Sequence, residues 1–103
     1  MNILLVCSAG MSTSLLVTKM EKAAKAQGKN HKIWAVAEAE AGLHIPNADV
    51  LLIGPQMRFW KKKAEEIAAP YNVPVAIINT VDYGMVNGEA VLEFAEKLAN
   101  QKK

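Results

Sequence analysis

Short apolar runs alternate with helix-periodic stretches along this chain. Residues 2–6 form a continuous apolar run, and similar short runs occupy residues 32–36, 49–53 and 73–78. Runs of this length are typical of parallel strands that are covered on both faces. We therefore expect four strands, of which the second is the more exposed.

Between these runs, apolar residues recur at the spacing of an amphipathic helix. After Ser12 they are Leu15, Leu16, Met20, Ala23 and Ala24; after residue 56 they are Met57, Trp60, Ala64, Ile67 and Ala68; near the end they are Val91, Leu92, Ala95, Leu98 and Ala99. Charged residues fill the opposite faces, as expected for helices that lie on a sheet. Gly28 and Pro70 predict the ends of the first two helices.

Two segments give weaker patterns. Residues 38–43 predict one or two helical turns before Pro46, because proline disrupts a helix interior. Residues 79–88 predict a loop. The segment that ends at Pro46 is the least defined part of the pattern.

Strands that alternate with helices predict a single α/β domain over residues 1–103, with an open parallel sheet and helices on both faces. The economical strand order is 2-1-3-4. In that order the first and third strands are neighbours where the winding reverses, and ligands of such sheets bind at the carboxyl ends of these strands. Cys7, Gln56 and the loop with Tyr83 should meet at this edge.

Composition narrows the choice of partners and compartment. The 103 residues carry a formal net charge of +2, and the basic residues are spread over several elements, so we expect no nucleic-acid surface. No apolar stretch approaches the ~20 residues of a membrane-spanning helix, and the start shows no secretory leader. We expect a cytoplasmic monomer that does not insert into a membrane. A single cysteine fits a reducing compartment and excludes an intramolecular disulfide.

That cysteine, Cys7, ends the first strand and is followed by loop-forming and helix-capping residues. A helix N-terminus after a strand presents unpaired backbone N–H groups that can hold an anion. The same groups favour thiolate over thiol, so we expect Cys7 to be a reactive nucleophile. The alternative is a buried cysteine that packs as a small hydrophobe.

A thiolate beside an anion site suggests a phosphocysteine intermediate. A phosphatase would hydrolyse it, and the pattern of cysteine phosphatases, Cys followed by five residues and Arg, would place arginine at position 13. This chain has Thr13 there. Without the bidentate guanidinium, hydrolysis of the phosphocysteine should be the step that is slowed most. This favours a carrier that keeps the phosphoryl group.

The stretch Cys7-Ser8-Ala9-Gly10-Met11-Ser12-Thr13-Ser14, with Gly54-Pro55-Gln56 and Tyr83-Gly84, resembles the enzyme IIB component of the bacterial sugar phosphotransferase system, in its lactose, cellobiose and diacetylchitobiose branch. The resemblance implies a fold like that of low-molecular-weight tyrosine phosphatases. It also implies a protein-phosphocysteine sugar phosphotransferase. Its cysteine takes a phosphoryl group from a phosphohistidine on the IIA component and passes it to a sugar held by the membrane component IIC.

Carried over to this chain, the resemblance makes Cys7 the phosphorylated residue. The residues of the loop around the phosphoryl group would be Ser8, Ala9, Gly10, Met11, Ser12, Thr13 and Ser14. The branch favours a β-linked disaccharide such as cellobiose or diacetylchitobiose, and the protein would sit at the inner face of the membrane through IIC. No cofactor and no metal are needed, because loop N–H groups can stabilise the transferred group.

Four further residues could border the site. Gln56 and Tyr83 either contact the phosphoryl group or edge the docking surface, or are ordinary loop residues. Arg58 is a candidate for docking an acidic partner. Asp82 occupies the loop in which related phosphatases keep their general acid, but an exposed turn residue is the favoured interpretation.

Two other functions remain open on the sequence. A small cysteine-dependent phosphatase would use Cys7 and Asp82. A redox or regulatory module would sense oxidants or phosphorylated ligands through Cys7.

Overall fold

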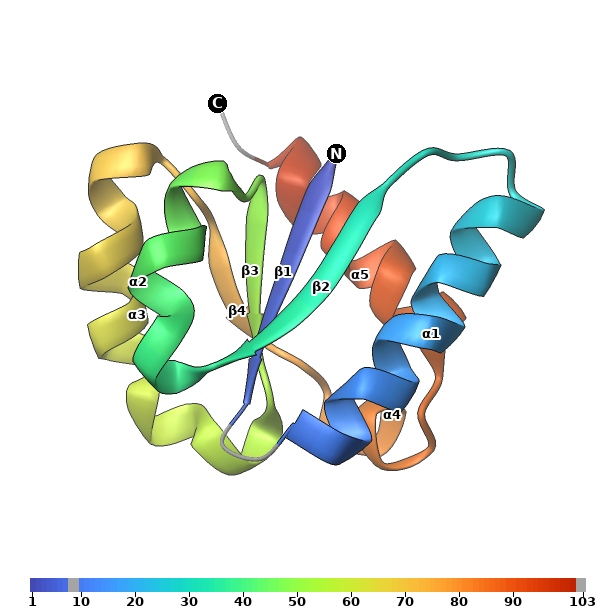
Figure 1. The fold of residues 1–103 in the computed structure, drawn as a ribbon, viewed down its shortest axis with the longest axis horizontal. Helices are drawn as coiled ribbons and strands as arrows, with labels where there is room; N and C mark the ends of the chain where they lie inside the picture. Colours follow the sequence, from blue (N-terminus) through green and yellow to red (C-terminus); the bar gives the residue numbers. More distant parts are fainter. Residues whose placement is uncertain (8–9, 102–103) are drawn as a thin grey trace.

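The computed structural model describes residues 1–7 and 10–101, and for residues 10–12 it describes the backbone only. Its centre is a parallel sheet of four strands: β1 (Asn2–Cys7), β2 (Lys32–Ala37), β3 (Val50–Ile53) and β4 (Val75–Ile77). Their order is β2-β1-β3-β4, which confirms the predicted topology (Figure 1). β1 is therefore a central strand between β2 and β3.

Helices cover both faces of the sheet. Helices α1 (Gly10–Ala26) and α5 (Gly88–Asn100) lie on one face, whereas α2 (Ala41–His44) and α3 (Lys61–Ala68) lie on the other (Figure 1). A short helix, α4 (Thr80–Gly84), lies near the carboxyl edge of the sheet, close to the start of α1. Within the part of the chain that the structure describes, no helix has the length and apolarity needed to cross a membrane.

The pleat of β1 divides the core into two clusters. Leu4 and Val6 pack under α2 and α3, and Ile3 and Leu5 pack under α1 and α5, all with 0% exposure. Burying each such side chain stabilises the fold by about 1.5–3 kcal/mol. The continuous apolar run that predicted a doubly covered strand therefore reflects real burial on both faces.

Helix α1 differs from the prediction on one residue. Leu16, Met20 and Ala24 are buried, but Leu15 is 51% exposed. Successive helical residues are separated by about 100°, so the face centred on Leu16 leaves Leu15 at the surface. The predicted end is confirmed: Gly28 follows the helix with φ +70°, a left-handed conformation that suits glycine.

Helices α2 and α3 end before Pro46 and Pro70, as the sequence predicts, and each proline lies in a 3-10 turn that follows the helix. Pro46 lies inside a 3-10 turn, Ile45–Asn47, and Pro70 lies inside another, Ala69–Tyr71, directly after α3. Proline is tolerated in the first turn of a helix because its missing N–H would have no partner there. The fourth strand is shorter than predicted, and residues 80–84 form α4 instead of loop.

A polar cluster ties distant segments together at the amino edge of the sheet. Glu96 of α5 accepts hydrogen bonds from Lys29 Nζ at 2.7 Å and His31 Nε2 at 2.9 Å. The second ring nitrogen of His31 lies 3.1 Å from the amino nitrogen of Met1. Partial burial acts to raise the pKa of the Glu96 carboxyl, but the hydrogen bonds and charges of Lys29 and His31 prevail and lower this pKa.

Because this pKa is lowered on folding, ionised Glu96 stabilises the protein above the ordinary carboxyl pKa, and that stability is lost as the pH falls through the folded-state value. Glu96→Gln should lower the free energy of unfolding by about 1 kcal/mol at neutral pH and by much less near about pH 3. Urea unfolding at both pH values measures this. Glu93→Gln, which breaks an exposed pair with Lys97, is the control with little effect. An equal loss for Glu96→Gln at both pH values would contradict the assignment.

Candidate active site

Cys7 is the last residue of β1 and lies at the carboxyl edge of the sheet. The register pairs it with Ala37 at the end of β2, and Gly54 N donates to the carbonyl of Val6 next to it. This is the point between β1 and β3 where the winding of the sheet reverses, so the predicted location of the cysteine is confirmed. Helix α1 begins at Gly10, only three residues further along.

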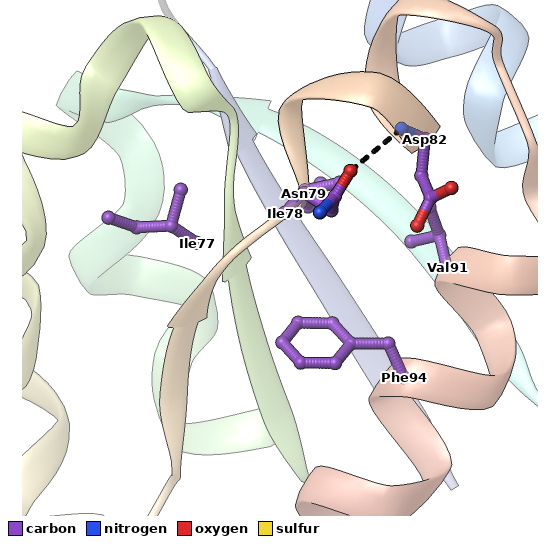
Figure 2. Close-up of a pocket in the computed structure, with 6 residues that line it drawn as sticks. All are labelled: Ile77, Ile78, Asn79, Asp82, Val91 and Phe94. Atoms are coloured by element: carbon purple, nitrogen blue, oxygen red, sulfur yellow. Dashed lines mark hydrogen bonds between the residues drawn. The ribbon is translucent and has the colours of Figure 1, made fainter.

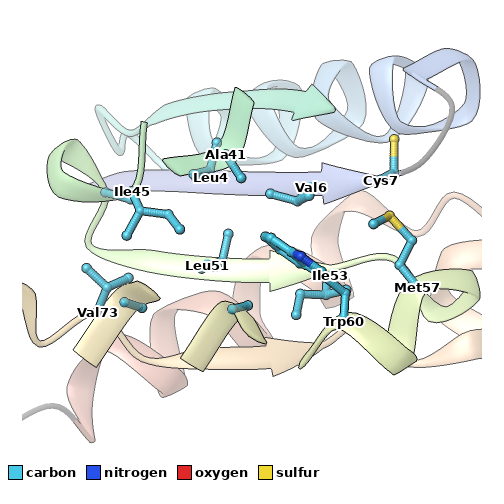
Figure 3. Close-up of a cluster of buried hydrophobic side chains, with 13 residues drawn as sticks. Leu4, Val6, Cys7, Ala41, Ile45, Leu51, Ile53, Met57, Trp60 and Val73 are labelled. Atoms are coloured by element: carbon cyan, nitrogen blue, oxygen red, sulfur yellow. The ribbon is translucent and has the colours of Figure 1, made fainter. Parts of the chain in front are cut away.

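The side chain of Cys7 is buried, with 1% exposure. It belongs to the apolar cluster under α2 and α3, which also contains Met57, and Figure 3 shows it at the end of β1. This burial is what the alternative interpretation, a cysteine packed as a small hydrophobe, predicts. The position of Cys7 at the strand end is what the interpretation as a nucleophile predicts. A phosphoryl donor can reach this sulfur only if the thiol becomes accessible.

The structure describes only part of the predicted phosphate loop. Ser8 and Ala9 lie outside the described residues, as do the side chains of Met11 and Ser12. The predicted ring of N–H groups around the sulfur therefore stays a prediction. Within the loop, Thr13 is 1% exposed, whereas Ser14 is exposed.

Three predicted site residues are joined by hydrogen bonds. Thr13 Oγ1 lies 3.1 Å from the hydroxyl oxygen of Tyr83, and Gln56 Nε2 donates to that same oxygen at 3.3 Å. These side chains come from α1, from the 3-10 segment Pro55–Trp60 and from α4. The structure thus brings together residues that are far apart in the sequence, at the edge where β1 and β3 end.

Glycine at position 54 leaves the space that this arrangement needs. A Cβ atom at Gly54 would lie 2.8 Å from Gln56 Oε1 and 3.7 Å from the Cβ atom of Cys7. The first distance is shorter than a normal contact, so Gln56 would have to move. Because Gly54 has no side chain, Gln56 can lie close to the end of β3, the strand that pairs with β1 beside Cys7.

An open groove of about 380 Å³ lies beside the tyrosine. It is lined by Pro55, Gln56, Arg58, Thr80, Tyr83 and Gly84. The Arg58 guanidinium donates to Pro55 O at 3.3 Å and to Thr80 Oγ1 at 3.4 Å, so the positive charge is held on the groove wall. Thr80 was not singled out from the sequence, because its segment read as a loop.

Asp82 lines a different cavity. Figure 2 shows this cavity, of about 360 Å³, between the end of β4, α4 and α5; its lining residues are Ile77, Ile78, Asn79, Asp82, Val91 and Phe94. Asp82 N donates to Asn79 Oδ1, which caps α4, and the carboxylate stabilises the first turn of that helix. Asp82 and Tyr83 are adjacent in sequence but line separate hollows. This placement favours the structural interpretation of Asp82.

Several exposed apolar side chains lie close in sequence to the residues of this site. Leu15 is 51% exposed, Phe59 75%, Val81 64% and Met85 72%. Each lies within two residues of a residue that joins the hydrogen-bonded set or lines the groove. Exposed apolar side chains among polar groups are typical of a surface that another protein covers. Among the described residues no cluster of three metal-ligating side chains occurs.

Comparison with known proteins gives a consistent result. A family described as "PTS system, Lactose/Cellobiose specific IIB subunit" matches residues 2–94. The chain is 48% identical over 103 residues to the PTS system galactose-specific EIIB component of Lactococcus lactis subsp. cremoris (strain MG1363), covering 95% of each. It is 47% identical over 96 residues to the oligo-beta-mannoside-specific EIIB component of Bacillus subtilis (strain 168), covering 93% of each.

Solved structures show the same fold. The solution structure of the cellobiose-specific phosphotransferase IIB component from Borrelia burgdorferi is 51% identical and matches with a TM-score of 0.83 over 100% of this chain and 94% of that one. The lactose-specific IIB domain from Streptococcus pneumoniae matches with a TM-score of 0.86, over 95% of this chain and 96% of that chain, at 13% identity. The second likeness concerns the fold alone.

Proposed function

Because this chain belongs to the lactose/cellobiose-specific IIB family of the sugar phosphotransferase system, we propose that Cys7 is the residue that carries the phosphoryl group. The protein is a phosphotransferase of sugar uptake. The observation that carries the proposal is the position of its single cysteine, at the end of central strand β1 and shortly before the N-terminus of α1. A helix start there can stabilise an attached anion.

The reaction that we propose has two transfers. In the first, the Cys7 thiolate attacks the phosphorus of a phosphohistidine on the IIA component; the P–S bond forms, the P–N bond breaks, and its electron pair stays on the imidazole. In the second, a sugar hydroxyl oxygen attacks the phosphorus, the P–S bond breaks and the thiolate is restored. The hydroxyl proton passes to a base outside this chain or to water.

Residues 8–14 would form the loop around the phosphoryl group. Thr13 stands where a cysteine phosphatase has its arginine, so the site lacks the fixed cation that stabilises hydrolysis at that position. This supports a carrier that retains the phosphoryl group until the sugar arrives.

The partners in this proposal are phosphorylated IIA as donor and the membrane component IIC, with its bound sugar, as acceptor. The exposure of the apolar side chains of Leu15, Phe59, Val81 and Met85 supports docking of a protein partner, with Arg58 on the groove wall as a cationic contact. We place the protein in the cytoplasm, as a monomeric IIB domain at the inner face of the membrane through IIC.

The sugar in this proposal is a β-linked disaccharide. Cellobiose appears in the name of the Borrelia burgdorferi protein and oligo-beta-mannoside in that of the Bacillus subtilis protein, and both sugars have β-linkages. The galactose-specific relative is similarly close in sequence. Uptake assays with cellobiose, a β-mannoside and galactose in cells with the cognate IIC component distinguish these substrates.

Incubation with phosphorylated IIA tests the assignment of Cys7. We expect the intact protein to gain the mass of one phosphoryl group, and peptide mapping to place that group on Cys7. The attachment should resist acid and be released by iodine, as expected of a phosphothioester. Modification of another residue, or no mass gain with a donor that phosphorylates another IIB protein, would overturn the proposal.

Asp82→Asn distinguishes the carrier from a phosphatase. Since Asp82 lines the cavity beside α5 and not the groove with Tyr83, the variant should keep its phosphoryl transfer rate within about twofold of the parent. Timed transfer from phosphorylated IIA measures this rate, and an aryl phosphate assay measures hydrolysis. A loss of about a hundredfold or more would show that Asp82 acts as a general acid.

A further inference from the structure

The Tyr83 hydroxyl joins three segments at the carboxyl edge of the sheet. It lies within hydrogen-bonding distance of Thr13 in α1 and of Gln56 after β3, and Tyr83 itself belongs to α4. Thr13 is the buried polar residue of the described chain, with 1% exposure. A buried hydroxyl without a hydrogen bond would cost stability, so the contact to Tyr83 has a clear energetic reason.

Donor and acceptor roles are compatible with both contacts at once. The amide nitrogen of Gln56 donates to the phenolic oxygen of Tyr83. The hydroxyls of Tyr83 and Thr13 can each donate or accept, so either one can supply the proton of the 3.1 Å bond between them. One phenol therefore satisfies both neighbours.

Thr13 lies in the first turn of α1, which starts at Gly10. The first N–H groups of a helix have no partner within the helix and are the groups that can face an anion. A hydrogen bond that holds Thr13 thus fixes the orientation of this turn relative to β3 and α4. The ring of Tyr83 packs against the cluster under α1 and α5, which holds the hydroxyl in place.

We propose that Tyr83 is a positioning residue of the phosphoryl site: through Thr13, its hydroxyl holds the first turn of α1 in the orientation that receives the phosphoryl group. This inference rests on the proposed role of Cys7. In it, Tyr83 acts through Thr13 and not by contact with the substrate. Gln56, at 3.3 Å and exposed, supports the phenol and has a smaller effect.

Tyr83→Phe tests the proposal because it removes the hydroxyl and keeps the packed ring. With phosphorylated IIA as donor, we expect the phosphorylation rate at saturating donor to fall about tenfold, with the half-saturating donor concentration unchanged. Tyr71→Phe is the matched control, because Tyr71 is 50% exposed and lies after α3 on the other face of the sheet. It should transfer at the parent rate.

A double-mutant cycle separates positioning from a general structural effect. Thr13→Val keeps the shape of the side chain and removes its hydroxyl. If Tyr83 acts through Thr13, the double variant should be no slower than the slower single variant. Thr13→Ser, which retains a hydroxyl, should recover most of the rate lost in Thr13→Val. Thermal unfolding confirms that each variant is folded at the assay temperature.

Three results would overturn the inference: a parent-like rate for Tyr83→Phe, a change confined to the half-saturating donor concentration, or rate losses that multiply in the double variant. If the parent protein accepts no phosphoryl group, the proposed function fails, and hydrogen exchange decides this inference by itself. Exchange at residues 14–17, whose N–H groups bond back into the first turn of α1, should be faster in Tyr83→Phe than in Tyr71→Phe. Equal exchange would overturn it.

Discussion

Replacing Cys7 with serine is expected to abolish phosphoryl transfer to sugar, lowering its rate by roughly three orders of magnitude or more. A serine hydroxyl is not ionised at neutral pH and is a poor nucleophile without an adjacent base. Even if serine took up a phosphoryl group, a phosphate ester would be a poorer donor than the phosphothioester. Formation of cellobiose phosphate, measured with phosphorylated IIA and membranes that contain IIC, gives the rate.

The burial of Cys7 requires a control for folding. The side chain of Cys7 is only 1% exposed, so serine at this position would place a hydroxyl in an apolar cluster. A buried hydroxyl without a hydrogen-bond partner lowers the free energy of unfolding by about 1–3 kcal/mol. Cys7→Ala avoids the buried hydroxyl and should be equally inactive while keeping the fold. Transfer by a folded Cys7→Ala variant would eliminate the phosphocysteine mechanism.

Among the glycines whose surroundings the structure describes, Gly88 is the one at which substitution by alanine is expected to cause the largest loss of stability. A Cβ atom at Gly88 would lie 2.5 Å from the carbonyl carbon of Lys19 and 2.7 Å from the amide nitrogen of Met20. Both are backbone atoms of α1, so no side-chain rotation relieves the clash and the two helices must separate. We expect a loss of about 2–4 kcal/mol in the free energy of unfolding.

Thermal unfolding measures this effect, and the melting temperature should fall by roughly 10–20 °C. Gly42→Ala is the matched control, because a Cβ atom at Gly42 in α2 meets no atom within 4 Å. That change should be neutral or stabilise the helix by up to about 1 kcal/mol. Equal melting temperatures for Gly88→Ala and the parent would show that α1 and α5 do not pack as closely as described.

The strand order followed from the sequence because burial leaves a strong signal there. The runs at 2–6 and 49–53 are apolar on both faces, as central strands require, and they became neighbours β1 and β3. Alternation with helices and the rule of right-handed crossovers leave few other arrangements for four strands. The prediction of a ligand edge at Cys7 needed only this topology.

The pattern of residues 79–88 did not predict α4, because the formation of a short helix depends on local capping more than on apolar periodicity. Asn79 Oδ1 accepts from the N–H groups of Val81 and Asp82, and this cap starts a helix of five residues. An asparagine before Thr80 was the available signal. The glycine at 84 and the short length of the segment obscured it.

The convergence of the candidate site residues could be predicted from the topology, but their contacts could not. Gln56 and Tyr83 follow strand ends, so their convergence could be expected, but the bond from Tyr83 to Thr13 depends on which way α1 turns its first residues. The exposure of Leu15 has the same origin: helical spacing gives the width of an apolar face but not the one residue on which it is centred.

The cluster under α1 and α5 joins both ends of the chain, since it contains Ile3 and Leu5 of β1 together with Leu92 and Ala95 of α5. During synthesis on the ribosome, α1 can cover part of this side of the early strand, but the cover stays incomplete until the last helix emerges from the exit tunnel. Contacts so distant in sequence close late and slow the folding of a chain. A nascent chain stalled before residue 88 would expose the part of this core that α5 covers and be a substrate for chaperones.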